Sequence, residues 1–281
     1  MALSDISLTA GMRSNLLSLQ KTANLLDRTQ DRLSTGKKVN SALDDPINFF
    51  AAQGHLNRAS DLAARKDGMA EAIQAIKSAD SGITGITELL QQAKAIITAA
   101  RSAGTTERQS LDDQFNAVRS QIADLAEDSI YKGTNLLGGD NLTVEFNEDG
   151  SNTLTITGFD ASSTAGTITP STGSAVTITQ ASWDGSTTAG QFDSGTQEID
   201  DALNLLRTES KNLSANLSIV TSRQEFTTNM INTLQKGADN LTLADMNEEG
   251  ANMLMLQTRQ ALGTTALALS SQAAQAVLRL F

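Results

Sequence analysis

Apolar residues recur along the chain at alternating intervals of four and three positions, beginning near the N-terminus. Between residues 12 and 36 the pattern occupies seven positions, one of which is polar: Met12, Leu16, Leu19, Ala23, Leu26, Gln30 and Leu33. This spacing is that of a narrow coiled-coil seam rather than the wider stripe of a globular helix. Gly36 follows the last seam position, where a left-handed residue commonly ends a helix. The stretch is therefore predicted to be a helix that needs a partner.

Helical spacing returns in four later stretches. Asp45 before Pro46 is a helix-start signal, and a helix is expected from there to about Arg101. Gly104 separates it from a second helix that ends before the turn at Asp128. Two more helices are expected, one from near residue 197 to 237 and one from about residue 245. The seams of these four stretches contain Ile86, Leu90, Ala93, Ile97 and Ala100; Leu111, Phe115, Val118, Ile122 and Leu125; Ile199, Leu203, Leu206, Ser210, Leu213, Leu217 and Val220; and Met255, Thr258, Leu262, Ala266, Leu269, Ala273, Val277 and Leu280.

The stretch from residue 139 to 195 has a different pattern of apolar and polar residues. Apolar and polar residues alternate over 142–146 and again over 154–156, on either side of the turn sequence Asn147–Gly150. This pattern predicts a β-hairpin. A further strand is expected over 175–179, with Trp183 nearby.

The order of elements is helix, helix, helix, β, helix, helix. It predicts a mainly α protein with a smaller β region. The simplest partner for the N-terminal seam is the C-terminal segment, folded back past the β region. The two ends would then form an antiparallel coiled-coil pair of long helices, with a β-hairpin-containing outer domain.

Charge narrows the set of partners. The formal net charge of −11 disfavours nucleic acid and anionic membranes, which are bound through Lys/Arg-rich surfaces. No Lys or Arg occurs between Lys132 and Arg207, so the middle of the chain is either an ordinary solvated acidic region or an exterior surface kept soluble at high density. Basic residues gather in the first forty positions and acidic ones over 239–249, and their attraction could set the register of the terminal helices.

Composition argues against several other classes of protein. The chain has no Cys, and no stretch approaches the ~20 apolar residues of a membrane span, so membrane insertion is not expected. The first residues lack the basic and apolar regions of a cleavable signal peptide.

Candidate catalytic chemistry is sparse. His55 is the only histidine, which removes two-histidine zinc sites, and no phosphate-binding glycine loop is present. Asp44 and Asp45 resemble a carboxylate pair, but their position before Pro46 favours helix capping. No enzyme activity, metal or cofactor is therefore expected.

Two separated stretches resemble bacterial flagellins. The first is residues 32–45, and the signature positions within it are Arg32, Leu33, Ser34, Gly36, Asn40, Ser41, Asp44 and Asp45. The second is residues 243–249 together with the ending 275–281. The turn over 131–137 is similar to the flagellin passage that leads into a β-hairpin. The resemblance covers roughly residues 1–157 and 197–281.

The resemblance implies a structural subunit that polymerises into the extracellular filament of the bacterial flagellum for swimming motility. It implies residues 1–44 as an N-terminal filament-core helix and linker, 45–138 as spoke helices, 139–195 as a β-rich outer region, 196–238 as a C-terminal spoke helix and 239–281 as a C-terminal core helix. The implied partners are further copies or other flagellins, the hook-associated junction and cap proteins, and an export chaperone. Export would use the flagellar type III apparatus without a cleavable signal peptide.

The terminal seams would then serve polymerisation, with the chain's own ends and those of neighbouring subunits as partners. We expect this polymerisation seam to contain Met12, Leu16, Leu19, Leu26, Leu33, Leu262, Leu269, Val277 and Leu280. Two alternatives stay open at this point. One is a hook–filament junction protein of the same superfamily. The other is a coiled-coil surface adhesin, or an enzyme carried on a filament.

Overall fold

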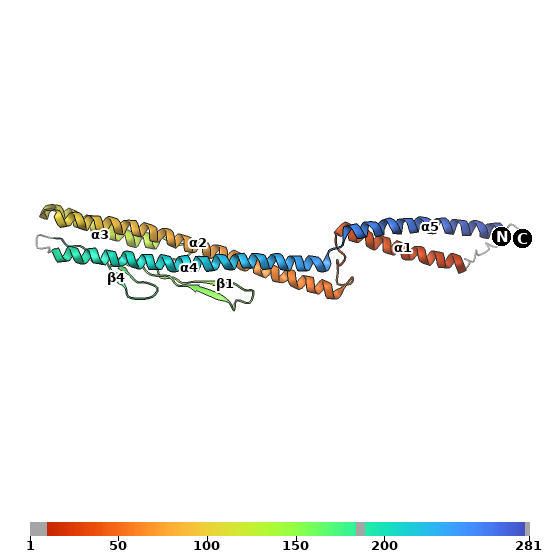
Figure 1. Ribbon diagram of the computed structural model, residues 1–281, viewed down its shortest axis with the longest axis horizontal. Coiled ribbons are helices and arrows are strands. Elements are labelled where there is room, and N and C mark those ends of the chain that lie inside the picture. Colours follow the sequence, from red (N-terminus) through yellow and green to blue (C-terminus); the bar gives the residue numbers. More distant parts are fainter. Residues whose placement is uncertain (1–9, 184–188, 279–281) are drawn as a thin grey trace. The chain divides into compact units, whose positions relative to one another are not determined.

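The computed structural model describes residues 10–183 and 189–278 and is built mainly of long helices (Figure 1). The elements in chain order are α1 (Ala10–Thr35), α2 (Pro46–Ser102), α3 (Thr105–Asp128), β1 (Leu142–Glu145), β2 (Thr153–Ile156), β3 (Thr167–Ile168), β4 (Val176–Thr177), α4 (Ala189–Thr242) and α5 (Met246–Leu278). This order confirms the predicted class, mainly α with a smaller β region.

Helix α4 is longer than its sequence pattern predicts. It begins at Ala189 rather than near residue 197, and it continues through Gly237 to Thr242. A glycine inside a helix costs only about 1 kcal/mol, and the neighbouring Leu234 and Ala238 are both buried. Burial of the flanking side chains therefore outweighs the helix-breaking tendency of Gly237.

The chain divides into two compact units. The first unit comprises the residues up to 57 and from 233 onward, and the second comprises residues 58–232. Helices α2 and α4 contribute residues to both.

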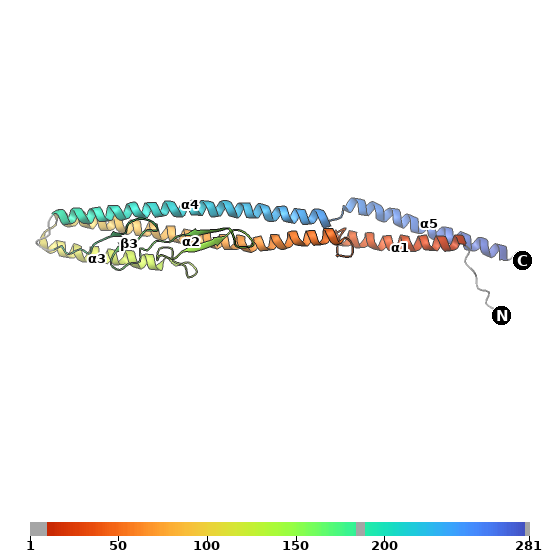
Figure 2. The ribbon, with the colours of Figure 1, turned by 90° about the horizontal axis from the view of Figure 1, so that it is seen from below.

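The second unit has a continuous hydrophobic core between α2, α3 and α4, which run side by side (Figure 2). Every predicted seam position of α2 and most of those on α4 are buried in this core, and on α3 two are buried and the other three are partly buried against it. The buried seam residues are Ile86, Leu90, Ala93, Ile97, Ala100, Phe115, Ile122, Ile199, Leu203, Leu206, Leu213 and Val220. The 4-3 spacing thus identified the packed face of each of these helices correctly.

The β region adds its apolar side chains to the same core. Strands β1 and β2 pair antiparallel with Leu142 opposite Ile156, which confirms the predicted hairpin. Strands β3 and β4 form a second small antiparallel pair, with Ile168 opposite Val176, and β4 lies in the stretch where a strand was expected. Ile156 and Ile168 are buried against the helices.

Arginines on the helices hold the acidic hairpin. Arg58 forms an ion pair with Glu148 at 2.6 Å, and Arg65 pairs with Glu145. From α4, the guanidinium of Arg223 lies 5.3 Å from the ring centroid of Phe146. The hairpin turn, which carries no cation of its own, is thus tied to cations on both α2 and α4.

The single tryptophan organises the start of α4. The Trp183 ring lies 5.2 Å from that of Phe115 on α3 and 5.5 Å from that of Phe192 on α4. All three rings are buried. Burial of Phe192 in this cluster accounts for helix at a Gly- and Ser-containing stretch where the sequence predicted none.

In the first unit, α1 and α5 lie side by side and run antiparallel (Figure 1). The partner of the N-terminal seam is therefore the C-terminal segment, as predicted.

Candidate assembly surface

The face that α1 turns toward α5 overlaps the predicted seam but is rotated from it. Met12 is buried, and Leu19, Leu26 and Leu33 are half-buried along one line. On the neighbouring line, Thr29 is buried and Gln30 is exposed. Leu16 lies on the same edge as Gln30 and is 40% exposed. The α1–α5 contact therefore leaves part of the α1 seam uncovered.

The predicted seam of α5 faces away from α1, which corrects the expected pairing. Leu256 is buried, and Gly263 and Leu267 are half-buried on the side toward α1. A Cβ at Gly263 would lie 2.6 Å from Leu19 Cδ2, so this glycine permits the close approach of α1. By contrast, Leu262 and Leu269 are 66% and 62% exposed. The side chain of Val277 and all of Leu280 lie outside the described residues.

Apolar side chains therefore occur on several sides of α5, and its last nineteen residues, 260–278, contain no Asp, Glu, Lys or Arg. A helix that is apolar on all sides is normally buried on all sides. No helix in the described part of the chain has the length and apolar content needed to cross a membrane.

Exposed apolar side chains are concentrated in the first unit. Of the sixteen exposed large hydrophobic residues among the described ones, thirteen lie there. They are Leu16, Leu17, Leu25, Leu43, Ile47, Phe50, Leu56, Leu243, Met246, Leu254, Met255, Leu262 and Leu269. An apolar surface of this extent marks a site of association.

The signature residues form the joint between α1 and the start of α5. Gly36 adopts φ +70° and its N–H donates to Arg32 O at 2.8 Å, which confirms the predicted left-handed helix end. The Gly36 carbonyl then accepts from Ala244 N at 3.0 Å, and Lys38 N donates to Thr242 O at 2.7 Å. Leu33 is half-buried against this joint and Ser34 is exposed.

Within the described residues, one ion pair joins the two terminal helices. Arg32 Nη1 lies 2.9 Å from Glu249 Oε1, and the Glu249 side chain is only 9% exposed. The sequence showed opposite charges at the two ends, and the structure confirms their attraction for this pair. Which acidic residue Arg32 would meet was decided by the fold.

The next signature residues build a rigid turn. One oxygen of Asp44 accepts hydrogen bonds from Asn40 N, Ser41 N and Ser41 Oγ at 2.9 to 3.1 Å. The backbone hydrogen bonds from Ser41 and Asn40 hold the pKa of the Asp44 carboxyl below its usual value. Asp45 caps α2 by accepting from Asn48 N at 3.1 Å. Both aspartates therefore have structural roles, as their position before Pro46 predicted.

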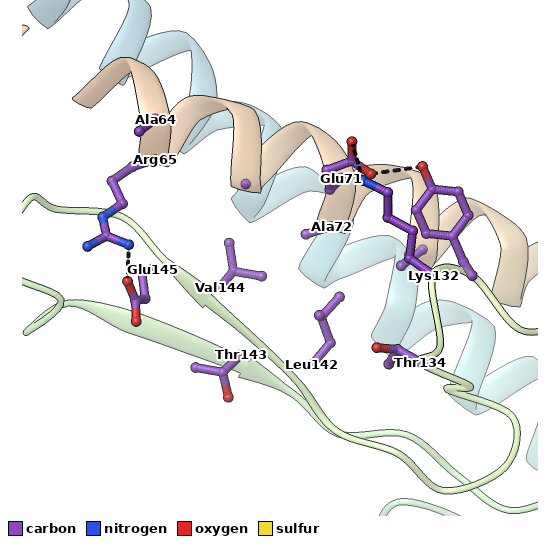
Figure 3. Close-up of a pocket in the computed structure, with 13 residues that line it drawn as sticks. Ala64, Arg65, Glu71, Ala72, Lys132, Thr134, Leu142, Thr143, Val144 and Glu145 are labelled. Atoms are coloured by element: carbon purple, nitrogen blue, oxygen red, sulfur yellow. Dashed lines mark hydrogen bonds and ion pairs between the residues drawn. The ribbon is translucent and has the colours of Figure 1, made fainter. Parts of the chain in front are cut away.

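The second unit contains a hollow of about 320 Å³ between α2 and β1 (Figure 3). Leu142 and Val144 point into it from the strand, and small residues of α2, among them Ala72, form its floor. An ion pair between Arg65 and Glu145 lies at one end (Figure 3).

At the other end of the hollow, Glu71 accepts from Tyr131 Oη at 2.9 Å and pairs with Lys132 Nζ at 3.0 Å. The hydrogen bond from Lys132 is the main cause of the lowered pKa of Glu71. Lys132 itself has a positive φ of 50°, which is rare for a residue with a side chain. These contacts fasten the 131–134 turn to α2.

Among the described residues, no group of three or more His, Asp or Glu side chains is placed to hold a metal ion. His55 is half-buried in α2, and its ring faces Gly237 of α4 within the first unit. The ion pairs that line the hollow stabilise the fold. The apolar surface of the first unit is the feature that indicates binding to a partner.

The second unit has a closed helical core, and the first unit has many uncovered apolar residues. Together these features define a structural subunit built to assemble. A family model described as the bacterial flagellin N-terminal helical region matches residues 6–142. Flagellin FljO and flagellin FljK of Caulobacter vibrioides are each 30% identical to the chain, over 285 and 289 residues, with 100% of both chains covered. A flagellin of Brucella melitensis is 26% identical over 279 residues, covering 95% of each chain.

The chain belongs to the bacterial flagellin family. It is a structural subunit of the flagellar filament, which lies outside the cell, and it self-assembles with subunits of its kind. This confirms the function implied by the two signature stretches.

Replacing Arg32 tests the ion pair between the terminal helices. Arg32→Ala leaves the largely buried Glu249 carboxylate without its cation, which is expected to destabilise the α1–α5 pair by about 1–3 kcal/mol. Hydrogen exchange should become faster in α1 and α5 and stay unchanged in α3. The matched control is Arg13→Ala, which removes an exposed arginine from the same helix. Equal effects of the two variants would contradict the assigned role of Arg32.

Two glycines of α2 test the packing of the second unit. Gly68 lines the hollow, and a Cβ there meets no atom within 4 Å, so Gly68→Ala should stabilise the chain by roughly 0.5–1 kcal/mol through helix propensity. At Gly82 a Cβ would lie 2.7 Å from Leu137 Cδ2 and nearer still to Ser129 Oγ. Gly82→Ala should therefore destabilise by about 1–3 kcal/mol. Urea unfolding of the monomer measures both, and a shift of the same sign for both would refute the packing described.

Proposed function

We propose that α1 and α5 form the surface through which this subunit polymerises, and that neighbouring copies cover the α5 face containing Leu262 and Leu269. The observation that carries the proposal is the concentration of exposed large apolar residues in the first unit. Covering apolar surface is worth about 25 cal/mol per Å², so many such contacts along a filament provide a strong driving force.

The proposed organisation follows from this surface. Residues 1–44 and 239–281 occupy the filament core, residues 45–138 and 196–238 form the spoke helices, and residues 139–195 lie toward the outside. In this arrangement the acidic β region faces solvent, where negative charge opposes lateral sticking of filaments. The proposed polymerisation seam retains all nine residues expected from the sequence, including Val277 and Leu280.

The subunit's other proposed partners are the hook-associated junction and cap proteins at the filament ends and an export chaperone. Other flagellins are proposed to join it in a mixed filament, which is supported by the several Caulobacter vibrioides flagellins that match the whole chain. Export is proposed to use the flagellar type III apparatus. We propose no catalytic activity for the chain, in keeping with a structural family.

Deleting residues 1–36 tests the role of α1. The truncated chain should keep the melting transition of the second unit, because α2, α3 and α4 supply that core, and it should not elongate filament seeds. Circular dichroism and sedimentation of seeded reactions measure the two properties. The full-length chain, refolded in parallel, must elongate the same seeds. Filaments grown from the truncated chain would disprove the proposal.

A double variant of the full-length chain tests the α5 face separately. Leu262→Gln combined with Leu269→Gln replaces two exposed side chains by polar ones of similar size and leaves the α1-facing Leu256 intact. The monomer should be as stable as the wild type, and the critical concentration for elongation should rise about tenfold or more. An unchanged critical concentration would show that neighbours do not cover this face.

A further inference from the structure

The turn between α1 and α2 presents a second apolar surface. Leu43 is 96% exposed, Ile47 81% and Phe50 64%. Leu43 lies in the turn, and Ile47 and Phe50 lie one helical turn apart on the same face of α2. Single exposed hydrophobic residues are normal on protein surfaces, but three within eight residues form a patch. We call these three residues the turn patch.

The polar signature residues hold the turn patch in place. Asp44 fixes the backbone on both sides of Leu43 by accepting hydrogen bonds from Asn40 N and Ser41 N, and Ser41 Oγ accepts from Leu43 N at 3.3 Å. Asp45 starts the helix that carries Ile47 and Phe50, and both of its carboxylate oxygens accept hydrogen bonds from Asn48. A surface that is already ordered loses less conformational entropy when it binds a partner.

We propose that the turn patch is a docking site for a second copy of this chain, a contact made in the filament in addition to those of α1 and α5. The inference rests on the proposed function and extends it to a surface outside the terminal helices. The inference also assigns a role to the polar signature residues. They act as positioning residues for the turn patch, and they are Asn40, Ser41, Asp44 and Asp45.

The continuity of the exposed surface identifies a second copy as the occupant. The linker before the turn is bonded to the joint between α4 and α5, through Lys38 N to Thr242 O at 2.7 Å. Leu243 and Met246, which begin the exposed stretch that continues along α5, lie at this same joint. A subunit that docks on α5 thus reaches the region of the turn as well. Contacts in an open filament are heterologous, so the turn patch meets a different surface of the neighbour rather than another turn patch.

Charge supports the same occupant. Beside the turn is a hollow of about 250 Å³ in which cations outnumber carboxylates. Its charged lining residues are Arg28, Arg32, Lys37 and Lys38 with Asp31 and Asp44. The chain as a whole carries a formal net charge of −11. A basic rim on an otherwise acidic chain complements the acidic surface of another copy, and complementary charges at a rim direct the orientation of docking.

The test replaces the three apolar side chains in the full-length protein. The triple variant Leu43→Gln, Ile47→Gln, Phe50→Gln should melt like the wild type, because these side chains are exposed in the monomer. Its critical concentration for elongating wild-type seeds should rise about tenfold or more, since each tenfold corresponds to loss of 1.4 kcal/mol of contact energy. The matched control is Phe226→Gln, which replaces an exposed aromatic side chain of α4 in the second unit and should leave the critical concentration unchanged.

The outcomes separate the two proposals. If the triple variant elongates seeds at the wild-type critical concentration while the Leu262 and Leu269 double variant does not, the turn patch is not a filament contact and the proposed function stands. If the wild-type chain itself fails to elongate seeds, the proposed function fails.

A second measurement tests the proposal even if the triple variant does not fold. A photo-crosslinking amino acid in place of Phe50 should give covalent dimers of this chain in filaments and none in dilute monomer. Filaments without crosslinked dimers would overturn the proposal, as would crosslinks from this position to a different protein only.

Discussion

The architecture depends on one constraint, which is that a single partner helix covers only one side of α5. Gly263 lets α1 approach closely, and Leu256 is buried between the two helices. The side that carries Leu262 and Leu269 then has no neighbour within the described residues of its own chain. Apolar surface in water is unfavourable, and in the proposed filament other copies cover that side. Assembly would then complete the burial that folding begins.

In the second unit, by contrast, the apolar faces of the helices are covered by other parts of the same chain. The buried line of α2, which includes Ile86, Leu90 and Ile97, is covered by α3, by α4 and by the β region of the same chain. Its acidic hairpin is fastened by arginines of the helices, and Glu209, a buried carboxylate of α4, accepts from both the backbone and the hydroxyl of Ser171 in the β3–β4 loop at 3.1 and 2.9 Å. A closed core and hydrogen-bonded loops explain how this unit can stay folded as a monomer.

The signature residues illustrate which structural roles can be predicted from the sequence pattern and the family resemblance and which cannot. The capping roles of Gly36 and Asp45 follow from local chemistry, and the structure confirms both. The partner of Arg32 does not follow, because several acidic residues near the start of α5 were equally plausible until the fold placed Glu249 beside it. The turn patch was also missed. Its signal was present in the apolar residues Leu43, Ile47 and Phe50, which belong to no predicted seam, but exposure can be judged only when the rest of the chain is in place.

The sequence by itself determined the helices of the second unit, the hairpin and the family, because the 4-3 spacing, the two-residue alternation and the paired signatures are local properties of the chain. Only the tertiary structure decided which side of each terminal helix is covered. The seam spacing of α5 selected Leu262 and Leu269, yet the small Gly263 on an adjacent side is what accommodates Leu19. The choice between two apolar sides depends on shape complementarity with a segment more than two hundred residues away in the chain, and spacing within one helix carries no information about that shape.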